Sequence, residues 1–461
     1  MRTFRASRGP RLLAVAAAAS LLVAACGGGG TPAPTTPIGP TSGPTTAPGS
    51  AEPSATPAGG YTGPEVTISY SIWGDPAELK SQQAIVDAFH AANPKITVKV
   101  EVSDWDPYFD KLQTGLAGGA APDVFAMDGP LFPDYQSRGV LLDLKPYIDR
   151  DGYDLTQLAD QGVADFTTAD GGQYGLPRDL NTVVLYYNKT MFDAAGLAYP
   201  DEAWDWAKFV EVAKQLTKDE NGDGTTDQWG FYTETTDMEN FWSSLVWQSG
   251  GDLLNADKTA TLLGTPEAAA GIQFLQDLIW KEKVMPDPAL FAETGDAFEQ
   301  GKAAMEANGS WLVPTHTAAG AELGYAFGIA PLPKGPAGRF TSVNPTGAVV
   351  YQGTKAPDAA WEFAKYLASP AAQEQLMKLK ASLPVSKEVL AGPYATSFEG
   401  AQVLADSLAY AKLKPSFAGY NEFTTILQGE LDTNVFNEPK KTAAEALADV
   451  VPKLEVFLAG R

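Results

Sequence analysis

The pattern of hydrophobic and polar positions becomes regular at Val66. From there to Ile72 apolar residues alternate with polar ones, the period-two pattern of a strand. Pro76 then opens a helical stretch, and the alternation returns over residues 96–102. One face of the predicted helix carries Leu79, Ile85, Val86 and Phe89. A strand, a helix and a strand with short connections predict a βαβ unit and a parallel sheet.

The rest of the chain predicts a mixed α/β protein with more than one core. Residues 122–125 (PDVF) read as a further short buried strand. Longer helical stretches follow at residues 204–217, 266–281, 356–367 and 442–458. About 400 residues are too many for a single hydrophobic core, so we expect two lobes.

The first 25 residues have the features of an export signal. Four arginines without any acidic residue precede an apolar run, Leu12 to Ala25, that is shorter than the roughly 20 residues of a membrane span. The run ends Val23-Ala24-Ala25-Cys26, which resembles the lipobox of bacterial lipoproteins, whose cysteine is acylated. The alternative is an ordinary signal peptide (residues 1–25) with an incidental cysteine.

Residues 26–64 predict a disordered linker behind the lipidated Cys26. The segment is rich in Pro, Thr and Gly and has almost no apolar side chains that a core could bury. Because Cys26 is the only cysteine, no intramolecular disulfide can form. The formal charge of −23 argues against nucleic acid or an anionic membrane surface as a partner. Membrane attachment is therefore expected through the lipid alone.

A series of short segments, in a fixed order, carries a resemblance to a known family. They are residues 71–74 (SIWG), 116–119, 121–125, 139–144, 174–177, 185–189, 192–197, 248–251, 298–305, 309–311, 359–367 and 383–385. Over almost all of residues 65–461 they resemble the family 1 extracellular solute-binding proteins, the maltose-binding-protein-like group. Each segment is weak by itself, and their order along the chain makes the resemblance specific.

This resemblance implies a two-lobed, periplasmic-binding-protein-like fold of type II. The chain would cross between lobes near residues 179–184, 342–346 and 392, so the lobes are discontinuous. The N-terminal lobe is expected to hold residues 65–180 plus 345–392, and the C-terminal lobe residues 181–344 plus 393–461. A ligand cleft would lie between them, and the family implies a monomer that delivers solute to the permease subunits of an ABC importer.

Candidates for catalysis are few. The chain has two histidines, His90 and His316, and no HExxH, GxSxG or Cys–His arrangement that would activate a nucleophile. We therefore expect a binding protein and not an enzyme. An extracellular carbohydrate-active enzyme stays open as an alternative, because pairs of acidic residues can hydrolyse glycosides.

Aromatic and polar residues near the expected strand ends suggest that the solute is a mono- or oligosaccharide. A sugar needs flat aromatic surfaces and a few fixed polar groups. The ligand-binding candidates are Trp73, Asp75, Asp128, Arg178, Asp179, Asn181, Glu239, Trp242, Trp311 and Tyr420, with Trp247 as a further aromatic. Core packing for the aromatics, and surface charges or ion pairs for the polar residues, are the competing interpretations. A non-sugar solute, namely a polyamine, a phosphate ester or a peptide, also stays open.

One acidic loop has the spacing of a calcium site. Oxygen-bearing residues recur at alternate positions from Asp219, with Gly224 sixth, as in an EF-hand loop. Gly230 stands at the twelfth position, where that loop has a bidentate Glu. The candidate ligands are Asp219, Asn221, Asp223, Thr225, Asp227 and Gln228. A structural Ca²⁺ remote from the sugar, or a metal-free turn, would explain the pattern; no cofactor is expected to be required.

Overall fold

A parallel sheet begins the fold where the alternation predicted it. The computed structural model describes residues 61–461, except 75, 235–238 and 292–294. In it β1 (Val66–Trp73), α1 (Pro76–Ala92) and β2 (Ile96–Ser103) form the βαβ unit. β1 pairs in parallel with β2 along its whole length, and with β3 (Val124–Asp128) on its other side. The predicted unit is confirmed.

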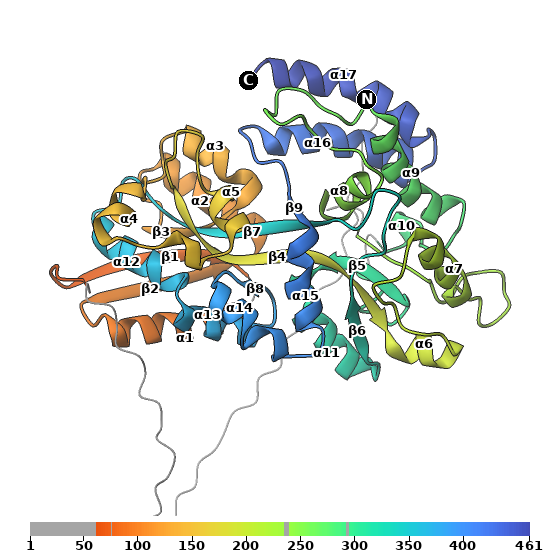
Figure 1. The fold of residues 1–461 in the computed structure, drawn as a ribbon, viewed down its shortest axis with the longest axis horizontal. Helices are drawn as coiled ribbons and strands as arrows, with labels where there is room; N and C mark the ends of the chain where they lie inside the picture. The colour runs from red at the N-terminus through yellow and green to blue at the C-terminus, as the bar shows by residue number, and fades with distance from the viewer. Residues whose placement is uncertain (1–60, 75, 235–238, 292–294) are drawn as a thin grey trace, which may run out of the picture. The chain divides into compact units, whose positions relative to one another are not determined.

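Two long strands connect this sheet to the rest of the fold. β4 (Gly175–Asn188) and β7 (Thr341–Val350) pair with each other, and the strand order is β2-β1-β3-β7-β4-β5. Figure 1 shows them running from the N-terminal strands toward β5 and β6. The remaining strands are β5 (Met305–Gly309), β6 (Phe327–Ala330), β8 (Leu383–Pro384) and β9 (Ala411–Leu413). The predicted crossings near 179–184 and 342–346 lie on β4 and β7.

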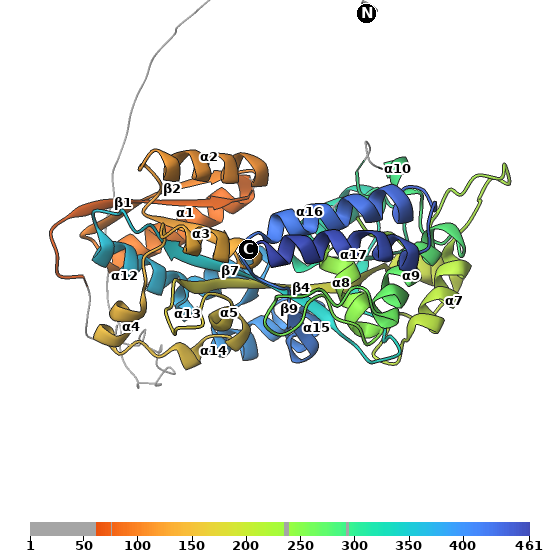
Figure 2. The ribbon, with the colours of Figure 1, turned by 90° about the horizontal axis from the view of Figure 1, so that it is seen from above.

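Helices cover the sheet, and the four long helices predicted from the sequence are present. Figure 2 shows α16 and α17 on one side of β4 and α15 on the other. The helices after α1 are α2 (Trp105–Ala117), α3 (Phe132–Ser137), α4 (Lys145–Asp151), α5 (Asp160–Asp165), α6 (Lys189–Ala195), α7 (Trp206–Leu216), α8 (Glu239–Gln248), α9 (Pro266–Trp280), α10 (Pro288–Phe291), α11 (Val313–Leu323), α12 (Pro357–Leu367), α13 (Pro370–Leu376), α14 (Lys387–Ala391), α15 (Ala401–Ser407), α16 (Tyr420–Leu431) and α17 (Ala443–Ala459).

One predicted core position is wrong. Ile85, Val86 and Phe89 on α1 are buried, whereas Leu79 is 41% exposed. Leu79 lies in the first turn of the helix, directly after the end of β1, and the deeper turns provide the buried contacts. Helical periodicity identifies a face but not how far along the helix the core extends.

The N-terminal predictions lie outside the described residues. These are the signal peptide at 1–25, the lipidated Cys26 and the linker up to residue 60. The described residues belong to one compact unit. Within the part of the chain that the structure describes, no helix combines the length and the apolar character needed to cross a membrane. The exact lobe boundaries, including the crossing near residue 392, stay predictions.

Candidate functional site

The strand register brings polar candidates from different strands side by side. Asp128 at the end of β3 is opposite Thr346 in β7, and Thr346 is opposite Asp179 in β4. Asn181, two residues further along β4, is opposite Asn344. Neighbouring strands lie about 4.8 Å apart, so Asp128 shares one region at the carboxyl end of β3 with Asp179 and Asn181, which lie about 50 residues later in the sequence.

Trp311 is held beside this region by its neighbours in the chain. β5 pairs with β4 so that Gly309 is opposite Val183. The hydroxyl of Ser310 then donates a 2.8 Å hydrogen bond to Oδ1 of Asn181. The half-buried ring of Trp311 lies over Gly309, where an added Cβ would come within 2.1 Å of it. Glycine is therefore needed at 309 for the ring to occupy this place.

Trp73 approaches the same region from the end of β1. It is half-buried, and its ring packs edge-on to Trp105 at 4.9 Å and is stacked on Phe109 at 5.8 Å. In open α/β sheets, ligands bind outside the carboxyl ends of the strands. We call Trp73, Asp128, Asn181 and Trp311 the strand-edge site; all four side chains are partly accessible to solvent.

Arg178 and Asp179 form a buried ion pair. Arg178 is 4% exposed, and its guanidinium is bonded to Asp179 and, at 2.9 Å, to Glu78 at the start of α1. Burial raises the pKa of Asp179, although the charge of Arg178 draws that pKa downward. The pair thus links β4 to α1, and its groups are already engaged with one another.

The other candidates are less accessible, or their side chains lie outside the described residues. Trp242, Trp247 and Tyr420 are each at most 5% exposed, and Tyr420 packs against Phe417. Asp75 lies outside the described residues, and Glu239 begins α8 without a described side chain. The structure therefore brings Trp73, Asp128, Arg178, Asp179, Asn181 and Trp311 into one region of the sheet, whereas Trp242, Trp247 and Tyr420 are buried.

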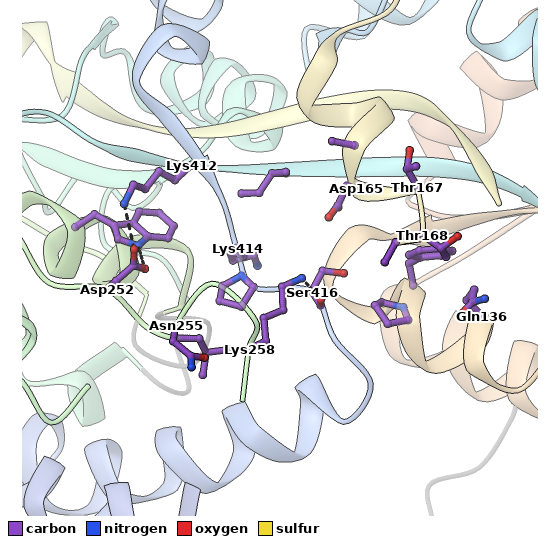
Figure 3. Close-up of a pocket in the computed structure, with 18 residues that line it drawn as sticks. Gln136, Asp165, Thr167, Thr168, Asp252, Asn255, Lys258, Lys412, Lys414 and Ser416 are labelled. Atoms are coloured by element: carbon purple, nitrogen blue, oxygen red, sulfur yellow. Dashed lines mark hydrogen bonds and ion pairs between the residues drawn. The ribbon is translucent and has the colours of Figure 1, made fainter. Parts of the chain in front are cut away.

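A cavity of about 670 Å³ (Figure 3) is lined by none of the four strand-edge residues, although Asp165 in its wall lies against Gly129, the residue after Asp128. Its lining comes from α3, from α5 with the turn after it, from residues 247–258 and from residues 412–416. The side chains include Lys258, Lys412, Lys414, Asp165 and Asp252. Of the aromatic candidates, only Trp247 lines it.

The two aromatic side chains that line the cavity, Phe132 and Trp247, are at most 3% exposed. The Trp247 indole N–H donates to Asp252 at 2.9 Å, and the Lys412 ammonium lies 5.5 Å from the indole ring. Lys412 in turn pairs with Asp252, as Figure 3 shows. Because a sugar needs accessible aromatic surface, the strand-edge site is the better candidate.

Asp165 is the buried carboxyl between the cavity and the strand-edge site. Burial, with a contribution from Asp128, raises its pKa to about 7, while Lys258 and Lys414 oppose the increase. Its Oδ2 lies so close to Gly129, the residue after Asp128, that a Cβ there would overlap it at 1.7 Å. A glycine at 129 thus leaves the space that the Asp165 carboxyl occupies next to Asp128.

In the acidic loop, the carboxylates accept hydrogen bonds from the loop's own backbone. Both Asp219 oxygens accept N–H groups, from Gly222 and Gly224 among others, and Asp223 accepts from Thr225. Gln228 is turned away and donates to the Leu216 carbonyl at 2.6 Å. Over the described residues, no group of three or more His, Cys, Asp or Glu side chains is arranged to hold a metal.

A buried titratable cluster lies behind Trp311. His316 of α11 is fully buried, with Nε2 3.0 Å from Glu306 of β5, and Tyr186 packs edge-on to its ring at 4.5 Å. Burial raises the pKa of Glu306 to about 7; burial and Glu306 raise that of Asp296 to about 8. Burial lowers the pKa of His316 to about 4. The folded protein therefore favours the neutral forms of all three groups.

This cluster predicts a pH-dependent stability. A carboxyl whose pKa is raised on folding stabilises the protein below its unfolded pKa, and this stability is lost as pH rises through the folded pKa. The pKa of His316 is lowered on folding, so this residue reduces the stability only as pH falls below about 6.5. The melting temperature should therefore fall from about pH 6.5 to about pH 8.5, and fall less in Glu306→Gln. An equal fall in Glu306→Gln and in the exposed control Glu211→Gln would contradict this assignment.

Sequence reasoning missed Trp105, Glu78 and the Glu306–His316 cluster. A signal for Trp105 was present, since it follows a predicted strand just as Trp73 does. The partners of Arg178 and His316 depend on which helix covers which strand, and no local pattern encodes that.

Comparison with known proteins identifies the family of this chain. The family model described as "Bacterial extracellular solute-binding protein" matches residues 73–374. The maltotriose-binding protein of Pyrococcus abyssi is 26% identical over 388 residues, which cover 82% of this chain and 79% of that protein. A binding protein of Brucella abortus is 25% identical over 384 residues, covering 82% and 89%.

Solved structures resemble the described fold closely. An ABC substrate-binding protein from Listeria monocytogenes, in complex with cycloalternan, superposes with a TM-score of 0.77 at 28% identity. The match covers 85% of this chain and 98% of that one. The two-lobed α/β architecture expected from the sequence is confirmed by this likeness.

Proposed function

Because the chain belongs to the family of bacterial extracellular solute-binding proteins, we propose that it captures a mono- or oligosaccharide outside the cytoplasmic membrane and delivers it to an ABC importer. One observation carries the proposal: two partly exposed tryptophans, Trp73 and Trp311, reach the strand-edge site from β1 and from the end of β5. Asp128 and Asn181 lie in the same region and offer oxygen and amide groups to hydroxyls.

Each part of the strand-edge site has a distinct chemical task. Indole rings cover the apolar C–H faces of a sugar. The Asp128 carboxylate accepts hydroxyl hydrogen bonds, which are stronger for an ionised acceptor. The amide of Asn181 is oriented by Ser310 and, through its Nδ2, by Asp179. This proposal assigns binding and no catalytic step to the chain.

Lobe closure would couple capture to transport. β4 and β7 pair with β3 on one side and with β5 on the other, so they are the connection about which the two ends would move. A ligand shifts such an equilibrium only through contacts that differ between the open and closed states. A sugar that touches both Trp73 and Trp311 would meet this requirement.

The relatives support a sugar over the other solute classes. One is named for maltotriose, and a solved structure at 28% identity holds cycloalternan, which are both oligosaccharides. Arg178, a cation of this region that could attract a phosphate ester, is already paired with two carboxylates. We therefore prefer a neutral sugar to a phosphate ester, a polyamine or a peptide.

A thermal-shift screen tests the proposal. A ligand that binds only the native state raises its melting temperature. We expect a rise with at least one mono- or oligosaccharide and none with spermidine or glycerophosphodiesters. A rise with the polyamine or the phosphodiester alone would replace the sugar by that solute class.

Cys26 is proposed as the membrane anchor. The Val23–Cys26 junction supports acylation of this cysteine after removal of residues 1–25. Cys26→Ser should then move the protein from the membrane fraction into the medium or periplasm. Cell fractionation measures this, and a variant that stays membrane-bound would contradict the anchor.

Calcium binding by residues 219–228 and a monomeric state stay proposals. The Asp219 and Asp223 carboxylates accept backbone N–H groups of the loop, and a carboxylate has further lone pairs with which it could bind a cation. The loop is an exposed segment after α7, apart from the strand-edge site in sequence and in strand register. Titration calorimetry with calcium decides whether it binds.

A further inference from the structure

The cavity of Figure 3 is large enough to hold a small molecule. Its volume of about 670 Å³ lies within the roughly 300–1,000 Å³ that is usual for ligand pockets. Its wall comes from α3, from α5 with the turn after it, from residues 247–258 and from residues 412–416. None of the strand-edge residues lines it, so a molecule bound there would contact a different set of side chains from the solute.

Asp165, the last residue of α5, is a buried acid in this wall. It is 8% exposed, and among the described residues no group forms a hydrogen bond with its Oδ2. Figure 3 shows its carboxyl directed into the cavity, toward the side where Lys258 and Lys414 lie. A buried polar atom without a partner destabilises the fold. The carboxyl is therefore available to accept a hydrogen bond from a molecule in the cavity.

Lys258 is held in the same wall by a strained backbone. Its φ of +60° is in the left-handed region, which non-glycine residues rarely adopt and which is found most often at functional sites. The Lys258 carbonyl accepts a 2.6 Å hydrogen bond from Arg461, and its ammonium donates at 2.6 Å to the Ser416 carbonyl. An ammonium has three N–H donors. Lys258 can therefore donate to a bound molecule while it keeps its bond to Ser416.

The charges of the wall favour an anion. The lining includes three lysines and two acids, which gives one excess positive charge when all five are ionised: Lys258, Lys412, Lys414, Asp165 and Asp252. One excess charge matches a carboxylate better than a doubly charged phosphate. The rings in the wall are almost fully buried, so the cavity does not have the stacking surface that a neutral sugar needs.

We propose that this cavity is a second ligand site, separate from the strand-edge site, and that it binds a small hydroxy-carboxylate. The carboxylate of the ligand accepts a charge-assisted hydrogen bond from Lys258 and is attracted by Lys414. A hydroxyl on a neighbouring carbon donates to Asp165, which satisfies the buried carboxyl. The proposal does not depend on which solute occupies the strand-edge site.

Titration calorimetry of the purified protein with D-gluconate tests the ligand class. Gluconate carries a carboxylate beside hydroxyls, whereas acetate has no hydroxyl and sorbitol has no carboxylate. We expect saturable binding of gluconate, with acetate, sorbitol and inorganic phosphate each at least about tenfold weaker. A probe of these three that binds as tightly as gluconate would overturn the hydroxy-carboxylate class. No saturable binding of gluconate would overturn the site.

Two variants test the residues. Lys258→Met removes the charge and should weaken gluconate about tenfold or more. Asp165→Ala should weaken it to a similar degree without lowering the melting temperature of the ligand-free protein, because the buried carboxyl is removed with it. Lys208→Met is the matched control, since the Lys208 side chain is 47% exposed on α7 and pairs with Glu211; it should leave gluconate binding unchanged. Full gluconate affinity in either cavity variant would overturn the assignment.

A competition experiment tests whether the two sites are separate. Gluconate is titrated into protein that has been saturated with the sugar giving the largest thermal shift. We expect gluconate still to bind, because the two ligands contact different side chains. Complete exclusion of gluconate by the sugar would show one shared site and would overturn the second site, while leaving sugar capture intact.

Discussion

Arg178→Met should lower the free energy of unfolding by about 3–5 kcal/mol, the cost of removing one partner from a buried ion pair. The guanidinium of Arg178 is bonded to Asp179 and Glu78, and both Arg178 and Asp179 are almost fully buried. Methionine keeps much of the side-chain volume but none of the charge. Asp179 would then have to take up a proton or attract water, and either outcome destabilises the fold.

The exposed Arg150 provides a matched control. It also bonds two carboxylates, Asp151 and Asp358, but its side chain is 48% exposed. Exposed pairs contribute at most about 1 kcal/mol, so Arg150→Met should shift the denaturant midpoint only slightly. Equal shifts in the two variants would show that the Arg178 pair does not hold β4 to α1. Adding Asp179→Asn to Arg178→Met should restore part of the loss, because no uncompensated carboxylate then remains at 179.

Trp311→Ala should weaken sugar binding at least about tenfold, or ~1.4 kcal/mol, with little change in melting temperature. The ring is partly exposed and lies over Gly309, beside the Ser310–Asn181 hydrogen bond. Removing it takes away a flat apolar surface that the sugar would cover and leaves a site that is already solvated. Titration calorimetry gives the affinity, and a thermal melt gives the stability.

A buried tryptophan provides a control that distinguishes a loss of sugar binding from a loss of core packing. Trp361 of α12 is fully buried, and its indole N–H donates to Asp151 at 2.7 Å. Trp361→Ala should cost about 3–5 kcal/mol of stability, while protein that remains folded keeps its sugar affinity. A Trp311→Ala variant that melts as low as Trp361→Ala, or that binds sugar as tightly as wild type, would place Trp311 in the core.

The individual strands and helices of the fold follow from the periodicity of hydrophobic residues in the sequence. Period-two alternation located β1 and β2, and helical periodicity located α7, α9, α12 and α17 to within two residues at either end. Leu79 shows the limit, because its helical phase matches the core face while its position in the first turn leaves it exposed. Periodicity carries no information on which turn of a helix reaches its neighbour.

The candidate site was predicted in part, because its pieces come from segments that only the sheet order joins. Trp73 and Asp128 were candidates because they lie at the ends of predicted strands, and Trp311 was a candidate because of the family resemblance. The ion pair between Arg178 and Glu78 joins residues 100 positions apart in the sequence, and it depends on α1 packing beside β4. Trp242 and Tyr420 are aromatic residues of the kind that contact sugars, but both are buried in this structure. Aromatic content alone does not distinguish a buried ring from an accessible one.

Titration calorimetry of the purified protein with the oligosaccharide that gives the largest thermal shift tests the central claim most directly. We expect saturable binding of one sugar per chain, weakened at least about tenfold by Trp311→Ala and unchanged by Tyr199→Ala, which removes a 38% exposed aromatic between α6 and α7. Binding that both variants retain in full would contradict the placement of the site at the ends of β1, β3 and β5. Absence of binding to every mono- and oligosaccharide, with saturable binding of spermidine or a glycerophosphodiester, would contradict sugar capture itself.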